Sequence, residues 1–208
     1  MIVTNYTDLK TEIVSYADRG DLTASIPGFI RMAEMRIRRD LDVRDMEARL
    51  CLPTIAGTQY YGLPARYRGM RHIHLNTSPI SSLDYLTPQL FFQKWAGSNS
   101  GKPVAYSIIG DEIALGPVPD GDYEIEMFIY QRYAELSDAN PVNWLITDAI
   151  DLLLYACNLE AALFIKDNDE IKKWGDLFEV ALDAIKKEDA QDRHSGGALM
   201  ITPDFSRF

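Results

Sequence analysis

The sequence predicts an α+β protein with a four-helix bundle from both chain ends, an inserted antiparallel β-domain and an extended C-terminal tail. Near both ends, apolar residues recur every three or four positions, which is typical of amphipathic helices. In the middle they alternate, and Gly, Pro, Asn and Asp interrupt them, as in strands joined by hairpins. We therefore expect a helical bundle from residues 1–44 and 134–194, a β-rich domain from 45–133 and an arm from 195–208.

The first two helices are predicted from their caps and apolar spacing. Thr7 is the expected cap of the first helix, and Gly20 is expected to close it. The second helix should begin near Ser25, with Pro27 in its first turn, where a missing N–H costs nothing. Its apolar stripe consists of Ile30, Ala33, Ile37 and Leu41. Four arginines lie off that stripe and should face outward, namely Arg31, Arg36, Arg38 and Arg39.

The β-domain is predicted from alternation and turn residues. Strands are expected at Met46–Leu52, Gln59–Leu63, Arg68–Leu75, Ile80–Leu83, Val104–Ile109, Glu112–Leu115 and Asp122–Tyr130. Gly110-Asp111 is expected to join two of these strands as a tight hairpin. A short helix, Pro88–Trp95, is expected to cover an open sheet edge.

The helical period returns after Asn140-Pro141. The third helix should run to about Lys166, and its broad apolar surface predicts burial on more than one side. The last helix should end before Ser195-Gly196-Gly197, which is typical of a flexible joint. The arm beyond that joint carries spaced apolar residues, namely Leu199, Met200, Ile201, Phe205 and Phe208. Such anchors suit docking in a partner's groove or on its edge strand, and terminal disorder is the alternative.

Composition restricts the function classes. The net charge of −10 argues against a general nucleic-acid-binding protein, because phosphate contacts need Lys and Arg. The charge is also uneven, since residues 31–72 carry nine arginines against five acids, whereas residues 110–192 carry six basic residues against twenty acids. No signal peptide or membrane span is expected. Cys51 and Cys157 have no metal-type spacing and are expected to be buried apolar residues.

A few residues could bind a metal or act in catalysis, and for each of them a structural role is favoured. His72 and His74 alternate on one strand and are favoured as polar strand residues, because a third metal ligand is missing nearby. Glu124 and Glu126 share a strand face, and paired carboxylates are the groups that hydrolyse glycosidic bonds, although a solvated face is favoured here. No phosphate loop or nucleophile elbow is present, and no cofactor is expected. The second-helix arginines suit either DNA phosphates or, as we favour, acids of a neighbouring subunit.

Short segments in the same order along the chain resemble phage adaptor proteins of the tail tubular protein A kind. These segments include Tyr6–Leu9, Ile26–Ile30, Met46-Glu47, Tyr60–Pro64, Gly101–Pro103, Leu136–Pro141 and Ser195–Gly197. The resemblance implies a homo-oligomeric ring, a dodecamer, below the portal protein and above a tail nozzle protein. It also implies a channel through which genome DNA passes without specific binding, and no membrane contact.

The primary hypothesis is therefore a structural virion protein, a head-to-tail adaptor made in the host cytoplasm and not an enzyme. In this hypothesis the arm at Leu199–Phe208 docks on the portal or the next subunit, and the second-helix arginines contact a neighbouring subunit. An acidic wall would repel DNA and let it slide. The alternatives are a tail-associated carbohydrate-active enzyme that uses Glu124 and Glu126, and a monomeric binding module.

Overall fold

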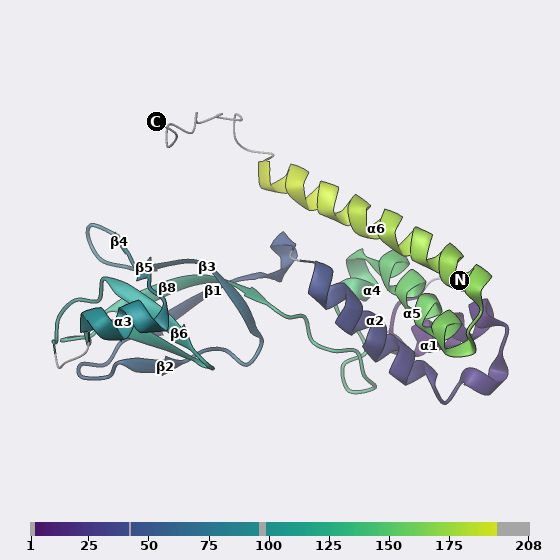
Figure 1. Ribbon diagram of the computed structural model, residues 1–208, viewed down its shortest axis with the longest axis horizontal. Helices are drawn as coiled ribbons and strands as arrows, with labels where there is room; N and C mark the ends of the chain where they lie inside the picture. The colour runs from purple at the N-terminus through teal and green to yellow at the C-terminus, as the bar shows by residue number, and fades with distance from the viewer. Residues whose placement is uncertain (1–2, 42, 96–98, 195–208) are drawn as a thin grey trace. The chain divides into compact units, whose positions relative to one another are not determined.

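The computed structural model describes residues 3–41, 43–95 and 99–194 (Figure 1). These residues divide into two compact units. The helical unit contains the chain up to Asp45 and from Tyr133 onward, and the β unit is Met46–Arg132. The fold is α+β.

The helical unit is built from segments on both sides of the β unit. Its elements are α1 (Tyr6–Ala17), the 3-10 turn η1 (Gly20–Leu22), α2 (Ile26–Asp40), α4 (Trp144–Asp148), α5 (Ile150–Ile165) and α6 (Asn168–His194). The expectation of one long third helix was wrong, because that helix is interrupted at Ala149, whose φ of −141° and ψ of 42° are not helical. A 3-10 turn, η2 (Arg44–Met46), lies at the junction of the two units.

The helix ends differ from the predicted caps. Asn5, not Thr7, caps α1, because its side chain accepts hydrogen bonds from the backbone N–H groups of Thr7 and Asp8. Asp18, not Gly20, closes α1 in the left-handed conformation, with a φ of 46°. Aspartate tolerates that conformation better than most residues do. Pro27 lies in the first turn of α2 as predicted, but the Ser25 side chain makes no capping hydrogen bond.

Helix α5 forms the centre of the helical unit, and it packs against α1, α2, α4 and α6. Its side chains are buried around most of its circumference, with Leu152, Leu153, Ala156 and Cys157 fully inaccessible to solvent. The prediction that this helix is buried on more than one side is confirmed. In Figure 1, α2 and α6 lie on different sides of α5.

The segment that returns from the β unit is attached to α2 through buried Glu34. The Glu34 carboxylate accepts a hydrogen bond from the Leu136 backbone N–H at 3.1 Å and one from Asn143 Nδ2 at 2.9 Å. Tyr133 Oη donates to the Glu34 carbonyl oxygen at 2.9 Å. Burial raises the pKa of the Glu34 carboxyl, and the hydrogen bonds from Leu136 and Asn143 oppose the rise.

The β unit is a sandwich of two sheets. The first has the order β1 (Glu47–Pro53), β8 (Glu124–Gln131), β3 (Tyr67–Leu75), β4 (Ser81–Ser82), and all its pairs are antiparallel. The second has the order β2 (Tyr60–Gly62), β7 (Glu112–Gly116), β6 (Ala105–Ile109), β5 (Asp84–Tyr85). The expectation of purely antiparallel strands was wrong at one edge, because β5 pairs with β6 in parallel. The chain reaches β6 from β5 through α3 (Pro88–Trp95), which packs against β6.

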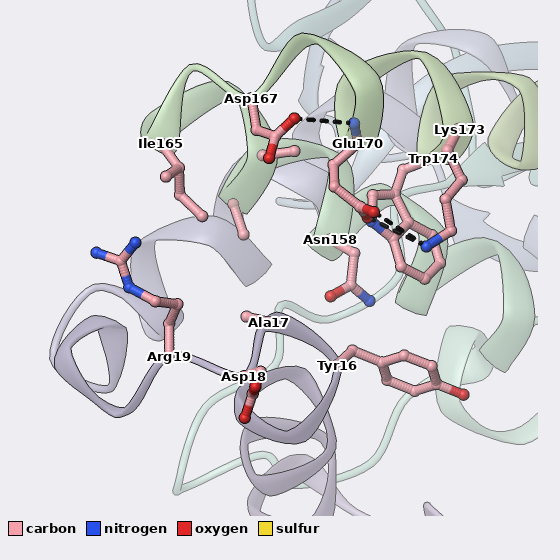
Figure 2. Close-up of a pocket in the computed structure, with 12 residues that line it drawn as sticks. Tyr16, Ala17, Asp18, Arg19, Asn158, Ile165, Asp167, Glu170, Lys173 and Trp174 are labelled. Carbon is pink, nitrogen blue, oxygen red and sulfur yellow. Dashed lines mark hydrogen bonds and ion pairs between the residues drawn. The ribbon is translucent and has the colours of Figure 1, made fainter.

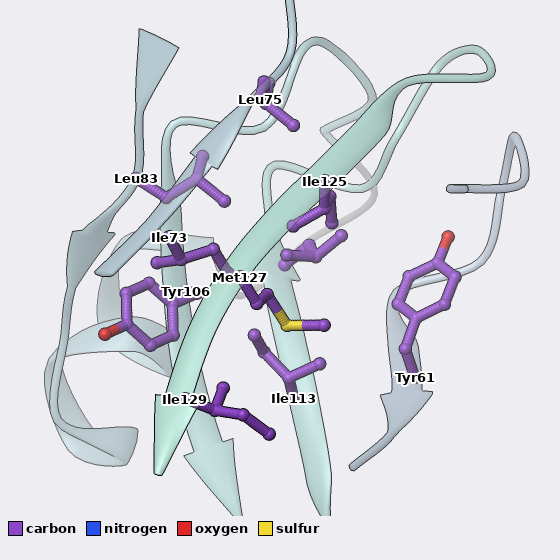
Figure 3. Packing of buried hydrophobic residues seen from close by; sticks show 10 residues of the cluster. Tyr61, Ile73, Leu75, Leu83, Tyr106, Ile113, Ile125, Met127 and Ile129 are labelled. Atoms are coloured by element: carbon purple, nitrogen blue, oxygen red, sulfur yellow. The ribbon is translucent and has the colours of Figure 1, made fainter. Parts of the chain in front are cut away.

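The core of the sandwich is formed by side chains that alternate along the strands (Figure 3). Ile125, Met127 and Ile129 point inward from β8 and meet Ile113 and Tyr106 of the opposite sheet. The intervening β8 residues lie on the outer face of their sheet, as a period of two requires. The β unit therefore has its own hydrophobic core.

Gly116 at the end of β7 is required by the packing of α3. A Cβ atom placed on Gly116 would lie 2.5 Å from Cδ1 of Trp95. The indole ring therefore lies directly against the glycine backbone. This contact fixes the C-terminal turn of α3 on the second sheet.

The substitution Gly116→Ala is expected to lower the free energy of unfolding of the β unit by about 1–3 kcal/mol, because the Trp95 ring must move. Gly62→Ala is the matched control, since a Cβ added there would meet no atom within 4 Å and Gly62 also lies in a strand of the second sheet. Thermal unfolding and tryptophan fluorescence measure both effects. Equal stability of the two variants would contradict the packing role of Gly116.

Glu34→Ala is expected to lower the free energy of unfolding by about 3 kcal/mol, because it leaves the Leu136 N–H and the Asn143 amide without an acceptor. Glu34→Gln keeps an acceptor oxygen and removes the charge. Since the folded-state pKa of Glu34 is raised, its ionisation costs stability as the pH rises from the ordinary carboxyl pKa through the folded one. The stability of the Glu34→Gln variant relative to the wild type should therefore increase as the pH rises through that window. A difference that is independent of pH would contradict this assignment.

Candidate functional site

The predicted arginines lie on two sides of α2. Arg36 and Arg39 line a hollow of about 270 Å³ together with Met32, Met35 and the α5 residue Glu160. Arg38 faces the return segment, and Arg31 lies two turns before it on the same side of the helix. The structure therefore places only two of the four arginines together at a surface hollow.

Arg36 forms an ion pair with a buried carboxylate inside the same chain. Its Nε and Nη2 atoms donate to Oε1 of Glu160 at 2.8 and 2.6 Å. Glu160 is only 4% exposed, whereas the Arg36 side chain is 36% exposed. A carboxylate in this position needs a cation to offset its lost hydration. Arg36 thus holds α2 against α5 in addition to lining the hollow.

Arg38 also has partners within the chain. Its Nη1 atom donates to Glu135 Oε1 at 3.1 Å, and its guanidinium lies 5.2 Å from the centre of the Tyr133 ring. Both partners belong to the return segment, which Glu34 also holds. Arg31 and Arg39 are exposed, and neither forms an ion pair with another residue of the described ranges.

Exposed apolar side chains of α2 and α5 accompany the hollow. Met32 is 53% exposed and Met35 42% exposed, although both belong to a well-packed helix. Phe164 of α5 is 60% exposed, and its ring lies 5.4 Å from the ring of Phe29 in α2. We call the set Met32, Met35, Arg36, Arg39 and Phe164 the α2–α5 face. Exposed large apolar side chains beside arginine are typical of protein interfaces.

A second hollow, of about 420 Å³, lies where the end of α1 approaches α5 and the start of α6 (Figure 2). Tyr16 and Trp174 form part of its wall with their rings edge to face, 5.8 Å apart. The buried amide of Asn158 points into it, and Nδ2 of that amide donates to the Leu154 carbonyl oxygen. At the rim, Lys173 pairs with Glu170 at 3.2 Å. The charges of this pair are therefore already compensated.

The histidines on β3 are placed as expected for strand neighbours. The rings of His72 and His74 lie 5.2 Å apart, and Phe128 of β8 packs beside both. Within the described ranges, no group of three or more His, Cys, Asp or Glu side chains is arranged to hold a metal ion. Cys157 is buried as expected, but the expectation for Cys51 was wrong, because it is exposed on the edge strand β1.

The two glutamates of β8 are each held by a different neighbour. Glu126 accepts hydrogen bonds from Arg49 Nε at 2.5 Å and Nη2 at 3.1 Å, and these bonds lower the pKa of its carboxyl. Glu124 accepts from Asn76 Nδ2 at 2.8 Å. The acid in glycoside hydrolysis needs a raised pKa, so Glu126 is poorly suited to that role.

The predicted arm residues, Leu199, Met200, Ile201, Phe205 and Phe208, lie outside the described residues. Sequence reasoning missed the α2–α5 face, although one signal for it was present. Met32, Met35, Arg36 and Arg39 follow the helical spacing i, i+3, i+4, i+7, and so form a second stripe beside the buried one. The partner of Arg36 had no local signal, because Glu160 is 124 residues away.

The described residues thus form two compact units, and the helical unit carries an exposed surface of apolar and basic side chains. The model of the SU10 adaptor protein family matches residues 4–201, and the chain belongs to this family of phage adaptor proteins. It is a structural component of the virion. No curated protein matches the chain. No described helix is long and apolar enough to cross a membrane.

Replacing Arg36 by Ala is expected to lower the free energy of unfolding by about 2 kcal/mol, because it leaves the Glu160 charge buried without its cation. Arg39→Ala is the matched control, since Arg39 is exposed on the same side of α2, and its effect should stay within about 0.5 kcal/mol. Chemical denaturation measures both. Similar small losses would show that the Arg36–Glu160 pair contributes little to the helical unit.

Proposed function

We propose that the chain is a subunit of a head-to-tail adaptor ring, a dodecamer that joins the portal protein to the tail nozzle protein. Membership of the SU10 adaptor family supports assembly with other virion proteins. The observation that carries the proposal furthest is the α2–α5 face, where Met32, Met35 and Phe164 lie in water in the isolated chain. Burying such side chains against a neighbouring subunit stabilises an assembly.

The likeness to adaptors of the tail tubular protein A kind is part of this proposal. The proposed ring surrounds a channel, and genome DNA passes through it during ejection without specific binding. The acidic half of the chain, with twenty acids against six basic residues over 110–192, supports a wall that repels phosphate. A wall of this kind lets DNA slide.

The second-helix arginines are proposed to contact the neighbouring subunit in two different ways. Arg39, which is exposed, is available to a carboxylate of another copy, and so is Arg31, which lies about two turns earlier on the neighbouring side of α2. Arg36 and Arg38 already bind Glu160 and Glu135, so their contribution to such a contact is mainly to position α2.

No specific observation favours the hypothesis of a carbohydrate-active enzyme, because the Arg49 hydrogen bonds lower the pKa of the Glu126 carboxyl. The monomeric binding module remains a distinct hypothesis that predicts a different mass in solution. Family membership supports the ring over that module.

Light scattering coupled to size-exclusion chromatography tests the ring. We expect a species several times the mass of one chain, either alone at high concentration or when purified portal is added. A mass equal to one chain under both conditions would contradict the ring and favour the monomeric module.

Deleting residues 199–208 is expected to leave the melting temperature nearly unchanged and to abolish stable association with portal, because the proposed arm serves docking and not the core. A pull-down with portal and a thermal melt of the same variant measure the two effects. Unchanged portal binding would rule out the arm, and a large fall in melting temperature would show that it packs on its own chain.

A further inference from the structure

Helix α6 carries a surface that complements the α2–α5 face. Four exposed residues on one side of α6 follow the spacing i, i+3, i+4, i+7, namely Asp176, Glu179, Val180 and Asp183. We call them the α6 stripe. All four are exposed, and Val180 is 69% exposed between the acids. The buried side of α6, which includes Trp174, Phe178 and Leu182, packs toward α5 and leaves this stripe in solvent.

The two surfaces match in chemistry and in length. The α2–α5 face offers arginine around the methionine-lined hollow, and the α6 stripe offers carboxylates around an exposed valine. Each runs over eight residues of helix, from Met32 to Arg39 and from Asp176 to Asp183, so that its end residues lie about 10 Å apart along the helix axis. In such a contact the Val180 side chain enters the hollow and the acids face Arg39.

The charges on either side of the α6 stripe restrict its alignment. Lys172 lies about one turn before Asp176, and Lys187 about one turn after Asp183, and both are exposed. Sliding a partner helix along α6 by one turn would bring a lysine toward Arg39. Like charges opposite each other disfavour that alignment, so the acidic segment defines one position for the contact.

The two surfaces of one chain are kept apart by the fold. Helix α5 packs against both α2 and α6, and in Figure 1 it lies between them. The outward stripe of α6 points away from α5, because the opposite side of α6 is the buried one. The α6 stripe is therefore open to the α2–α5 face of a different molecule.

We propose that the α2–α5 face of one copy binds the α6 stripe of the next copy. This inference rests on the proposed function, because it names the subunit contact of the proposed ring. The contact joins two different surfaces, so a pair of copies leaves the α6 stripe of one copy and the α2–α5 face of the other free. Repetition of such a heterologous contact closes into a ring when the rotation between copies permits it. The partner is thus a second copy of this chain.

Two charge-reversed chains test the contact. The first carries Arg39→Glu, and the second carries Asp176→Lys, Glu179→Lys and Asp183→Lys. Each alone should weaken self-association at least about tenfold, because like charges then meet at every contact. A 1:1 mixture should recover assembly. In an alternating ring, the carboxylate introduced into α2 of the first chain meets the lysines of the second, and the native surfaces meet at the remaining contacts.

Sedimentation velocity at several concentrations measures the assembly of the wild type, of each variant and of the 1:1 mixture. Portal is added if the wild type requires it. Arg66→Glu is the matched control, because it reverses an exposed arginine of the β unit, outside both proposed surfaces, and it should assemble like the wild type. Circular dichroism checks that each variant is folded.

The possible results distinguish an error in the two assigned surfaces from an error in the proposed ring. A wild-type chain that never assembles would contradict the proposed function. If the wild type assembles while Arg39→Glu assembles equally well, or if the 1:1 mixture stays dissociated, the assignment of these two surfaces is wrong and the ring is built through other contacts.

Discussion

The two-unit architecture depends on the hydrogen bonds that the buried carboxylate of Glu34 accepts. The helical unit is assembled from two parts of the chain that the whole β unit separates, so its formation requires the returning segment to find α2. Glu34 binds that segment through the Leu136 N–H and the Asn143 amide, and Arg38 binds it through Glu135. The β unit closes on its own hydrophobic core. With the return segment in place, α5 packs into the centre of the helical unit.

Much of this fold was predictable from apolar spacing alone. Helix α2 was found because Ile30, Ala33 and Ile37 mark its buried side, and β8 was found from the alternation seen around Met127. Local details were harder to predict, because several residues competed for the same task. Asn5 caps α1 where Thr7 was also suitable, and Ala149 interrupts a helix without any Gly or Pro to indicate the break.

The candidate site was less predictable, because it depends on contacts between distant segments. The outward position of Arg39 followed from the helical period. The partner of Arg36 did not, since Glu160 belongs to a strongly apolar helix and is brought to α2 only by tertiary packing. The same packing places the exposed Phe164 against Phe29 of α2, so that apolar and basic side chains share this surface.

In the proposed ring, the helical unit forms the contacts between copies, and the β unit is a separate module with its own core. Amide hydrogen exchange, compared between free and assembled protein, tests that division most directly. Assembly is expected to slow exchange on α2, on the C-terminal half of α5 and on α6, where the proposed surfaces lie. Slower exchange confined to the strands of the β unit, with these helices unchanged, would contradict the account.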